Sequence, residues 1–335
     1  MKGVKFKDNF VKLKEEGPRN ATTTNFYGSY FLSENEHVFD INEFEDNLEM
    51  NMMTHEENLL ILEIKNLNVS IANALRRIML SEVPTIAVEK VNIFQNTGII
   101  ADEILCHRLG LIPFKFDADL INYKDECEKY NHLNCFCFKL HVKFTKKLGS
   151  NEKYRSIYSR DLKWCPINEQ QKTKFQNNQP KVVDDNILIT KISNGQEIEL
   201  VCFLEKGIGK THAKWSPVCT AVYKMYPSFS FNTDEEFTKE EKQDLINICP
   251  KNVFDMEDSD NLVAKKPLDC SSCRVCIEKY PKKISFEKIK NHFVFTIEST
   301  GCFPAADIFK KALLILKEKV LSVKGALEDQ TMVLS

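Results

Sequence analysis

Long hydrophobic runs and a strong charge of either sign are both missing from this 335-residue chain. No apolar stretch approaches the ~18 residues that a membrane-spanning helix needs. The N-terminal segment MKGVKFKDNFVKLKEEG also lacks the apolar core of a signal peptide. The formal net charge of −2 argues against a surface that itself grips DNA, because phosphate neutralisation dominates nucleic-acid affinity. We therefore expect a soluble intracellular protein with no membrane contact and no direct, sequence-specific DNA contact.

Catalytic signatures are missing as well. The sequence has no D-x-D-x-D run or similar carboxylate cluster of the kind that a two-metal polymerase centre requires. The GIGKT segment superficially resembles a phosphate-binding loop, but that motif needs a glycine five residues before Gly209, where Leu204 stands. Lys210, His212 and Lys214 then favour a polar loop that faces a partner. We expect a protein that is not itself an enzyme.

What is present is an ordinary globular composition, with 43% hydrophobic and 28% charged residues. The length allows two or more packed units. The 12 cysteines are many for a disulfide framework, and in a reducing interior we expect thiols or metal ligands instead.

The segment VSIANALRRIMLSEVP predicts a short amphipathic helix. Asn68 or Ser70 can cap its start, and Pro84 stops it. Arg76 and Arg77 lie on its polar face. Its apolar stripe consists of Ile71, Ala74, Leu75, Ile78 and Met79.

A second helix is predicted from Pro304 to Val323, since proline favours the first turn of a helix and Asp307 suits its N-terminal end. With Ile315 and Leu321 its apolar face is wider than packing within one chain usually needs. That width fits a helix pair shared with another chain, although a deeply buried helix would look the same. One face carries Ile308, Phe309, Ala312, Leu313, Leu316 and Val320.

Strands are predicted where apolar and polar residues alternate or apolar residues run together, in LLILEIKNL, IAVEKVNIF, CFKLHVKF and QEIELVCF. Residues 1–50 are polar with scattered aromatics, which indicates an extended arm that orders on a partner.

Three blocks resemble the alpha-type assembly subunits of multisubunit RNA polymerases, the family that includes the bacterial alpha subunit and its archaeal counterpart. The first joins NALRRIMLSEVPTIAVEKV to ADEILCHRLGLIPF. The others are ISNGQEIELVCFLEKGIGKTHAKWSPVCTAVYKMYP and NHFVFTIESTGCFPAADIFKKALLILKEKV. The resemblance implies an α+β fold with a discontinuous dimerisation domain (a sheet plus two helices), an inserted β-rich domain and a small ferredoxin-like insertion.

That architecture divides the chain into an N-terminal extension (1–50), the first part of the dimerisation domain (51–84), the insert domain (85–230), the cysteine insertion (231–285) and the second part of the dimerisation domain (286–335).

The resemblance also implies a non-catalytic subunit of a DNA-directed RNA polymerase in the nucleus, both nucleolus and nucleoplasm. Its two apolar stripes would pair with a smaller alpha-like subunit. The pair would form the platform for the second-largest subunit and for small zinc-binding subunits. The side chains expected to contact these other subunits are Arg76, Arg77, His107, Arg108, Lys210, His212 and Lys214.

Two features are similar to the branch that RNA polymerases I and III share: the long N-terminal segment, and GIG followed by SPVCTAVYKMYP. The alternative is the RNA polymerase II branch, which carries a compact zinc loop, C-x-C-x3-C-x2-C, after the HRLGLIP block. Here Cys127, Cys135 and Cys137 stand at other spacings. With His132 they are a weaker candidate zinc site, and ordinary core or surface thiols are the competing interpretation.

The segment DCSSCRVCIEKYP places Cys270, Cys273 and Cys276 in a C-x2-C-x2-C pattern. Ferredoxins continue this pattern with x3-C-P, but Tyr280 stands at the expected fourth position. Upstream, Cys249 precedes a proline and supplies the missing C-P pairing. The four cysteines therefore make one candidate four-thiolate site, similar to the ferredoxin-like insertion of archaeal alpha-type subunits.

The sequence leaves three alternatives for this site: a [4Fe–4S] cluster, a Zn²⁺ ion, or an empty, vestigial loop. Zinc sites usually arrive as two separated C-x2-C pairs, whereas three cysteines in seven residues favour the cluster. A structural role is expected, since a short polar insertion needs such a staple to fold. The rival function from another class is a free-standing ferredoxin-like electron carrier.

Overall fold

The computed structural model describes residues 10–14, 17–19, 41–125, 127–146, 153–232 and 235–334. The helices in these ranges are α1 Ile41–Asn47, α2 Val69–Ser81, α3 Asp102–Gly110, α4 Glu169–Lys174, α5 Lys239–Ile248, α6 Val275–Lys279 and α7 Ala305–Leu334. The strands are β1 Phe10–Lys14, β2 Gly17–Arg19, β3 Glu49–His55, β4 Leu59–Lys65, β5 Pro84–Asn96, β6 Phe114–Lys115, β7 Phe136–Lys143, β8 Tyr154–Tyr158, β9 Lys163–Trp164, β10 Lys181–Val182, β11 Leu188–Ser193, β12 Glu197–Ile208, β13 Val218–Phe231, β14 Phe254–Met256, β15 Leu262–Ala264 and β16 Ile284–Ser299. The mixed α/β architecture agrees with the predicted class.

The largest sheet has six strands, in the order β2-β1-β16-β4-β3, with β13 also paired to β16. Strand β1 runs antiparallel to β16, with Leu13 opposite Phe286. The sequence predicted that residues 1–50 form an extended arm that becomes ordered only on a partner. That prediction is wrong for residues 10–14 and 17–19, which form strands within the chain's own sheet. Residues 1–9, 15–16 and 20–40 of that segment lie outside the described residues.

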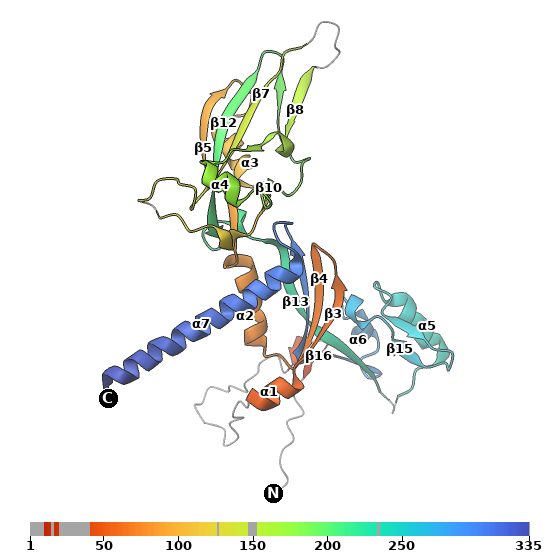
Figure 1. Ribbon diagram of the computed structural model, residues 1–335. Helices are drawn as coiled ribbons and strands as arrows, with labels where there is room; N and C mark the ends of the chain where they lie inside the picture. The colour runs from red at the N-terminus through yellow and green to blue at the C-terminus, as the bar shows by residue number, and fades with distance from the viewer. Residues whose placement is uncertain are drawn as a thin grey trace. The chain divides into compact units, whose positions relative to one another are not determined.

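A second sheet has the order β5-β12-β7-β9, and β5, β12 and β7 lie side by side in Figure 1. Along β7 the side chains alternate between buried and accessible positions, as the sequence pattern predicts. One face is buried through Phe136, Phe138, Leu140 and Val142. Helix α3 packs on β5.

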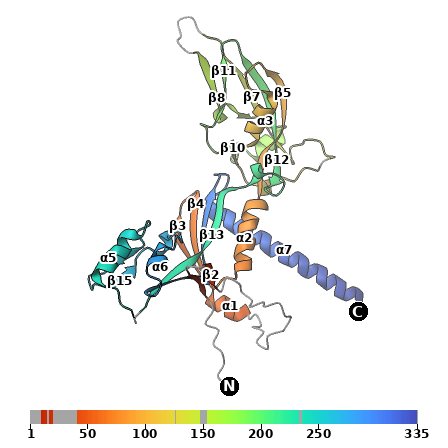
Figure 2. The same cartoon turned by 180° about the vertical axis from the view of Figure 1, so that it is seen from behind.

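The described chain divides into two compact units. The first contains the described parts of residues 1–53, 61–72 and 223–295; the second contains 54–60, 73–222 and the described part of 296–335. Within the first unit, α5, α6 and β15 gather together, as Figure 2 shows. They share one hydrophobic core with the long strand β16, which contributes the last two of its buried side chains. The core consists of Leu245, Val253, Phe254, Leu262, Ile277, Ile284 and Phe286.

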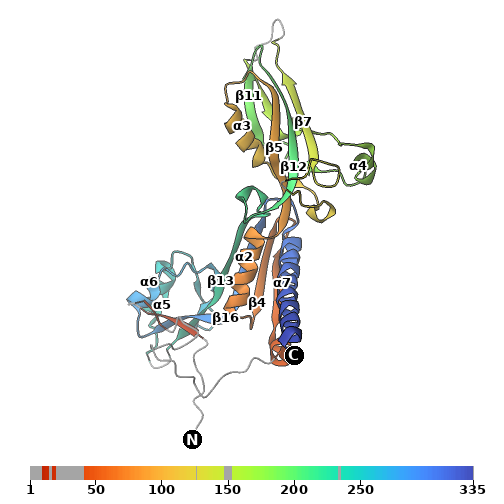
Figure 3. The same ribbon diagram turned by 90° about the vertical axis from the view of Figure 1, so that its left-hand side faces the viewer.

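Helix α2 begins and ends where the sequence predicts. The Asn68 side chain accepts a hydrogen bond from the amide of Ser70 (2.8 Å), so Asn68 is the cap. The helix ends at Ser81, three residues before Pro84. Helix α7 begins after Pro304 but continues to Leu334, well beyond the predicted end at Val323. Figure 3 shows it as one unbroken helix to the C-terminus. No helix among the described residues is long and apolar enough to cross a membrane.

Candidate functional site

The apolar stripe of α2 is largely covered by its own chain. Leu75 is only 2% exposed, and Ile78 and Met79 are also buried. Ile71 and Ala74 are half-buried. Most of this stripe therefore packs in the core of the single chain. Only its N-terminal part, Ile71 and Ala74, is accessible enough to contact another molecule.

The predicted stripe of α7 is divided in two. Its first three members, Ile308, Phe309 and Ala312, are buried. Further along the helix, Leu313 is 39% and Val320 is 60% exposed, and Leu316 between them is half-buried. The first two turns thus anchor the helix in its own chain, and from Leu313 to Leu327 most of the same face is accessible to solvent.

The exposed part of this face is longer than the predicted stripe. Val323 and Leu327 follow Val320 at spacings of three and four residues and are 62% and 59% exposed. This alternation of three and four is the spacing at which one helix packs along another. The same periodicity runs through the sequence beyond the predicted end of the helix, where it could have been found. We call this face the α7 seam: Leu313, Leu316, Val320, Val323 and Leu327.

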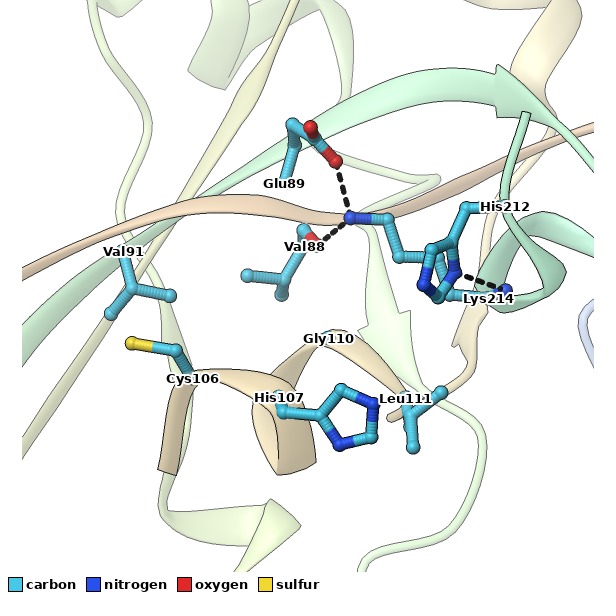
Figure 4. A pocket seen from close by; sticks show the side chains of 9 residues that line it. All are labelled: Val88, Glu89, Val91, Cys106, His107, Gly110, Leu111, His212 and Lys214. Carbon is cyan, nitrogen blue, oxygen red and sulfur yellow. Dashed lines mark hydrogen bonds and ion pairs between the residues drawn. The ribbon is translucent and has the colours of Figure 1, made fainter. Parts of the chain in front are cut away.

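A pocket on the second unit brings together three of the residues predicted to contact other subunits. His107 comes from α3, while His212 and Lys214 come from the loop after β12 (Figure 4). The exposed Leu111 lies at the rim. The remaining lining residues are Val88, Glu89, Val91, Cys106 and Gly110.

Lys214 is held firmly at this pocket. Its Nζ donates to the carbonyl oxygen of Val88 (2.8 Å), pairs with the Glu89 carboxylate and lies 4.4 Å from the centre of the Trp215 ring. His212 caps the turn, since its Nδ1 accepts the amide proton of Lys214 (3.1 Å). Because Glu89 neutralises Lys214, the pocket has no unpaired cation at its base and suits a polar or apolar side chain better than an anion.

The GIG motif is explained by close packing. A Cβ on Gly207 would lie 2.3 Å from the Trp215 ring, and one on Gly209 would lie 2.2 Å from the carbonyl oxygen of Leu80 in α2. The amide of Lys210 donates to the carbonyl oxygen of Ser81 (2.8 Å). Glycine is therefore required at position 207 by the Trp215 ring and at position 209 by backbone approach to the end of α2, and phosphate binding is not needed to explain the motif.

The arginines predicted to contact other subunits differ in their exposure and in their hydrogen bonds within the chain. Arg108 donates to the carbonyl oxygens of Ile189 (2.9 Å) and Leu188 (2.7 Å), so its guanidinium braces β11 within the chain. Arg76 is half-buried and donates to the side-chain oxygen of Asn73. Arg77 is exposed.

The four cysteines of the candidate metal site line one small pocket in the first unit, with Phe229, Val253, Phe254 and Phe286 among its walls. Burial raises the pKa of the Cys270 thiol, and it raises the pKa of Cys276 to about 11. Tyr280, at the position of the missing ligand, donates its hydroxyl to Asp244 (2.6 Å). Among the described residues, no group of three or more histidine, cysteine, aspartate or glutamate side chains is arranged to hold a single metal ion.

The loop between these cysteines has an unusual backbone. Ser272 and Arg274 both adopt left-handed conformations, with φ of 59° and 69°. The amide of Ser272 points at the sulfur of Cys270 (3.3 Å), and that of Val253 points at the sulfur of Cys249 (3.4 Å). Backbone amides turned inward by left-handed residues form concavities for anions, Fe–S clusters included.

The weaker candidate zinc group is dispersed. Cys135 is buried, and burial raises its pKa to about 12; its sulfur lies 3.5 Å from the carbonyl oxygen of Asn131. Cys127 is exposed, and Cys137 lies on β7 as predicted. Together with His132 they form no metal-holding group in the described part of the chain.

The comparisons with known proteins point to subunits of DNA-directed RNA polymerases. Residues 62–320 match the family described as the RNA polymerase Rpb3/Rpb11 dimerisation domain. The chain is 40% identical over 314 residues to "DNA-directed RNA polymerases I and III subunit rpac1" of Dictyostelium discoideum, covering 92% of this chain and 90% of that one. It is 36% identical to "DNA-directed RNA polymerases I and III subunit RPAC1" of Mus musculus, covering 92% of each. Similarity to "DNA-directed RNA polymerase II subunit rpb3" of Dictyostelium discoideum is lower, at 31% over 84% of this chain and 98% of that one.

Proposed function

This chain belongs to the RNA polymerase Rpb3/Rpb11 dimerisation-domain family, and on that premise we propose that it is the alpha-like assembly subunit shared by RNA polymerases I and III. It is a non-catalytic part of these enzymes and acts in the nucleus, including the nucleolus. The greater identity to relatives named for polymerases I and III than to the one named for polymerase II supports this branch.

The single observation that carries the proposal is the α7 seam. Three of its members, Val320, Val323 and Leu327, are each about 60% exposed, at the spacing of a helix-pairing face. Regularly spaced apolar side chains on one helix are costly to leave in water and mark an interaction surface. We assign this surface to a second helix with its own apolar stripe, supplied by a smaller alpha-like subunit.

The pocket on the second unit is the proposed contact for the second-largest subunit. His107, His212 and the exposed Arg77 and Lys210 offer polar groups to such a partner. Arg76 and Arg108 are already hydrogen-bonded within the chain and act by positioning. The small zinc-binding subunits complete the assembly. We divide the chain as the sequence suggested, with the dimerisation domain in segments 51–84 and 286–335, and the insert domain in 85–230.

Native affinity purification of the tagged full chain, with the bound proteins identified by mass spectrometry, tests the proposal. We expect the largest subunits of both polymerases I and III. Recovery of the largest subunit of polymerase II alone would keep the family and overturn the branch. Recovery of no polymerase would overturn the function.

At the cysteine insertion we propose a structural [4Fe–4S] cluster held by Cys249, Cys270, Cys273 and Cys276, with zinc as the alternative. The four thiols line one pocket. Three of them lie within seven residues of the sequence, which is the ferredoxin spacing, whereas zinc sites usually have two separated C-x2-C pairs. The left-handed residues in the loop favour the same choice.

Anaerobically purified full chain should then contain about four irons per chain, with visible absorption from thiolate-bound iron. Cys273→Ser should lose most of the iron, because it removes one of four ligands; the residue is exposed, so the substitution itself removes no core packing. Cys219→Ser, at an exposed cysteine outside the pocket, is the matched control and should keep it. Stoichiometric zinc, or no metal in the unmutated chain, would contradict the cluster.

A further inference from the structure

Two cysteines stand opposite each other at the edge of the four-stranded sheet. Strands β7 and β9 are antiparallel, with Phe138 opposite Trp164. One step further in this register, Cys137 is opposite Cys165. Cys165 directly follows the end of β9 at Trp164, and its amide donates to the carbonyl oxygen of Cys137, with 2.8 Å between nitrogen and oxygen, so the two backbones are still joined at this pair.

This placement suits the formation of a disulfide. Opposite residues that are hydrogen-bonded in an antiparallel pair typically have Cα atoms about 5.5 Å apart, and one bond of such a pair joins Cys165 to Cys137. Disulfides have Cα separations of about 4.4–6.8 Å, most often near 5.5–6 Å. Opposite residues also project from the same face of the sheet. Both cysteines are free thiols.

The two thiols differ in their surroundings. Cys165 is exposed and directly follows the edge strand β9. Cys137 is half-buried, because its other neighbour across the sheet is Phe203, and the Tyr130 ring stacks on Phe203 at 4.6 Å. An oxidant from solvent therefore reaches Cys165 first.

We propose that Cys137 and Cys165 are a redox-modification site, at which a hydroperoxide converts two thiols into a reversible cross-strand disulfide. This inference rests on the pair alone and is independent of the proposed function.

The chemistry balances with hydrogen peroxide as the hydroperoxide and the only oxidant. The thiolate of Cys165 attacks the peroxide oxygen, the O–O bond breaks, and a sulfenic acid forms with release of water. The thiolate of Cys137 then attacks the sulfenic sulfur, the S–S bond forms, and a second water leaves. The two thiols lose two electrons and two protons, and hydrogen peroxide is reduced to two water molecules. A small thiol reverses the bond by exchange.

Other cysteines near this pair are poor competitors. Cys135 is buried and Cys202 is buried on β12, and burial raises the pKa of each thiol to about 12. Thiolates are the nucleophiles in these steps, so such thiols react slowly at neutral pH. Burial, followed by the neighbouring Cys165 thiol, raises the pKa of Cys137 itself to about 11. Its position directly opposite Cys165 compensates through a high effective concentration.

The disulfide would reinforce an existing contact between α4 and the segment that precedes β7. Gln171 of α4, a few residues after Cys165, donates to the carbonyl oxygens of Cys135 (2.9 Å) and His132 (3.2 Å) just before β7. Oxidation would add a covalent bond beside these hydrogen bonds and hold the β9–α4 segment against the sheet. Reduction would leave the hydrogen bonds to hold it alone.

The test treats the purified full chain with hydrogen peroxide, blocks free thiols with an alkylating agent, and digests it without reductant for mass spectrometry. We expect a linked peptide joining Cys137 to Cys165, lighter than its two parts by two hydrogens. Its yield should rise on the order of tenfold or more over untreated protein, because the thiols are held at high effective concentration. Dithiothreitol should abolish it.

Cys165→Ser should remove the linked peptide, whereas Cys127→Ser, which changes another exposed cysteine, should leave it unchanged. Because the unmutated chain supplies the main readout, a folding defect in a variant cannot imitate the result. Cys165 recovered as sulfinic acid or linked to another cysteine, with Cys137 still alkylated, would overturn the proposal.

Discussion

Replacing Val320 and Val323 of α7 by aspartate together should separate the chain from its polymerase while leaving it folded. Both side chains are more than half exposed, so the isolated chain loses little core packing. In the complex, each carboxylate would be buried against a partner helix without a counter-charge. A charge buried without a partner costs about 3–5 kcal/mol, which lowers affinity on the order of 100-fold or more.

Quantitative mass spectrometry after native purification measures this loss, and circular dichroism with thermal unfolding checks the fold. Ser322→Asp is the matched control, because it adds the same charge to the same exposed helix at a position well off the seam. It should retain the partners. A double variant that recovers every subunit at the level of the unmutated chain would show that the α7 seam is not the pairing surface.

Leu75→Asp on α2 should unfold or severely destabilise the chain before any partner is involved. From the sequence, this substitution would be expected to abolish pairing by burying an unpaired charge at the interface. In the structure Leu75 is 2% exposed, so aspartate would lose an apolar core contact and bury a carboxylate. The combined cost of about 4–6 kcal/mol approaches the whole stability of a typical domain, about 5–15 kcal/mol.

Soluble yield and the midpoint of chemical denaturation of the isolated chain measure this effect. Arg77→Asp adds the same residue on the exposed side of α2, two positions later, and should leave the midpoint nearly unchanged. If Leu75→Asp had the stability of the unmutated chain and lost only its partner, the α2 stripe would belong to the subunit interface after all.

Helix and strand positions could be predicted well where local pattern decides them. The cap at Asn68 and the stop before Pro84 place α2 correctly, and the alternation in CFKLHVKF places β7. The predicted end of α7 is too early, because the helix continues through Gly325 although glycine weakens helices. Strands β1 and β2 were missed, since five and three residues are too short to show a clear period, and they take strand form only through pairing within the sheet.

Some residues of the candidate site could be predicted from the sequence and others could not, because their roles depend on contacts within the folded chain. His107, His212 and Lys214 were named separately from the sequence, and the fold brings them to one pocket. Arg108 carried the same expectation, but its guanidinium is used within the chain. No spacing in the sequence distinguishes these two outcomes, because hydrogen-bond partners eighty or more residues away determine them.

By itself, the sequence determined the types of element, the family blocks and the apolar stripes on both helices, because these depend on residues close together in the chain. Tertiary structure alone decided which half of the α7 stripe is covered, that Leu75 is core, and that Cys165 stands opposite Cys137. Burial and cross-strand register arise from contacts between residues far apart in sequence. The same periodic pattern therefore serves a core or an interface equally well until the rest of the chain has packed around it.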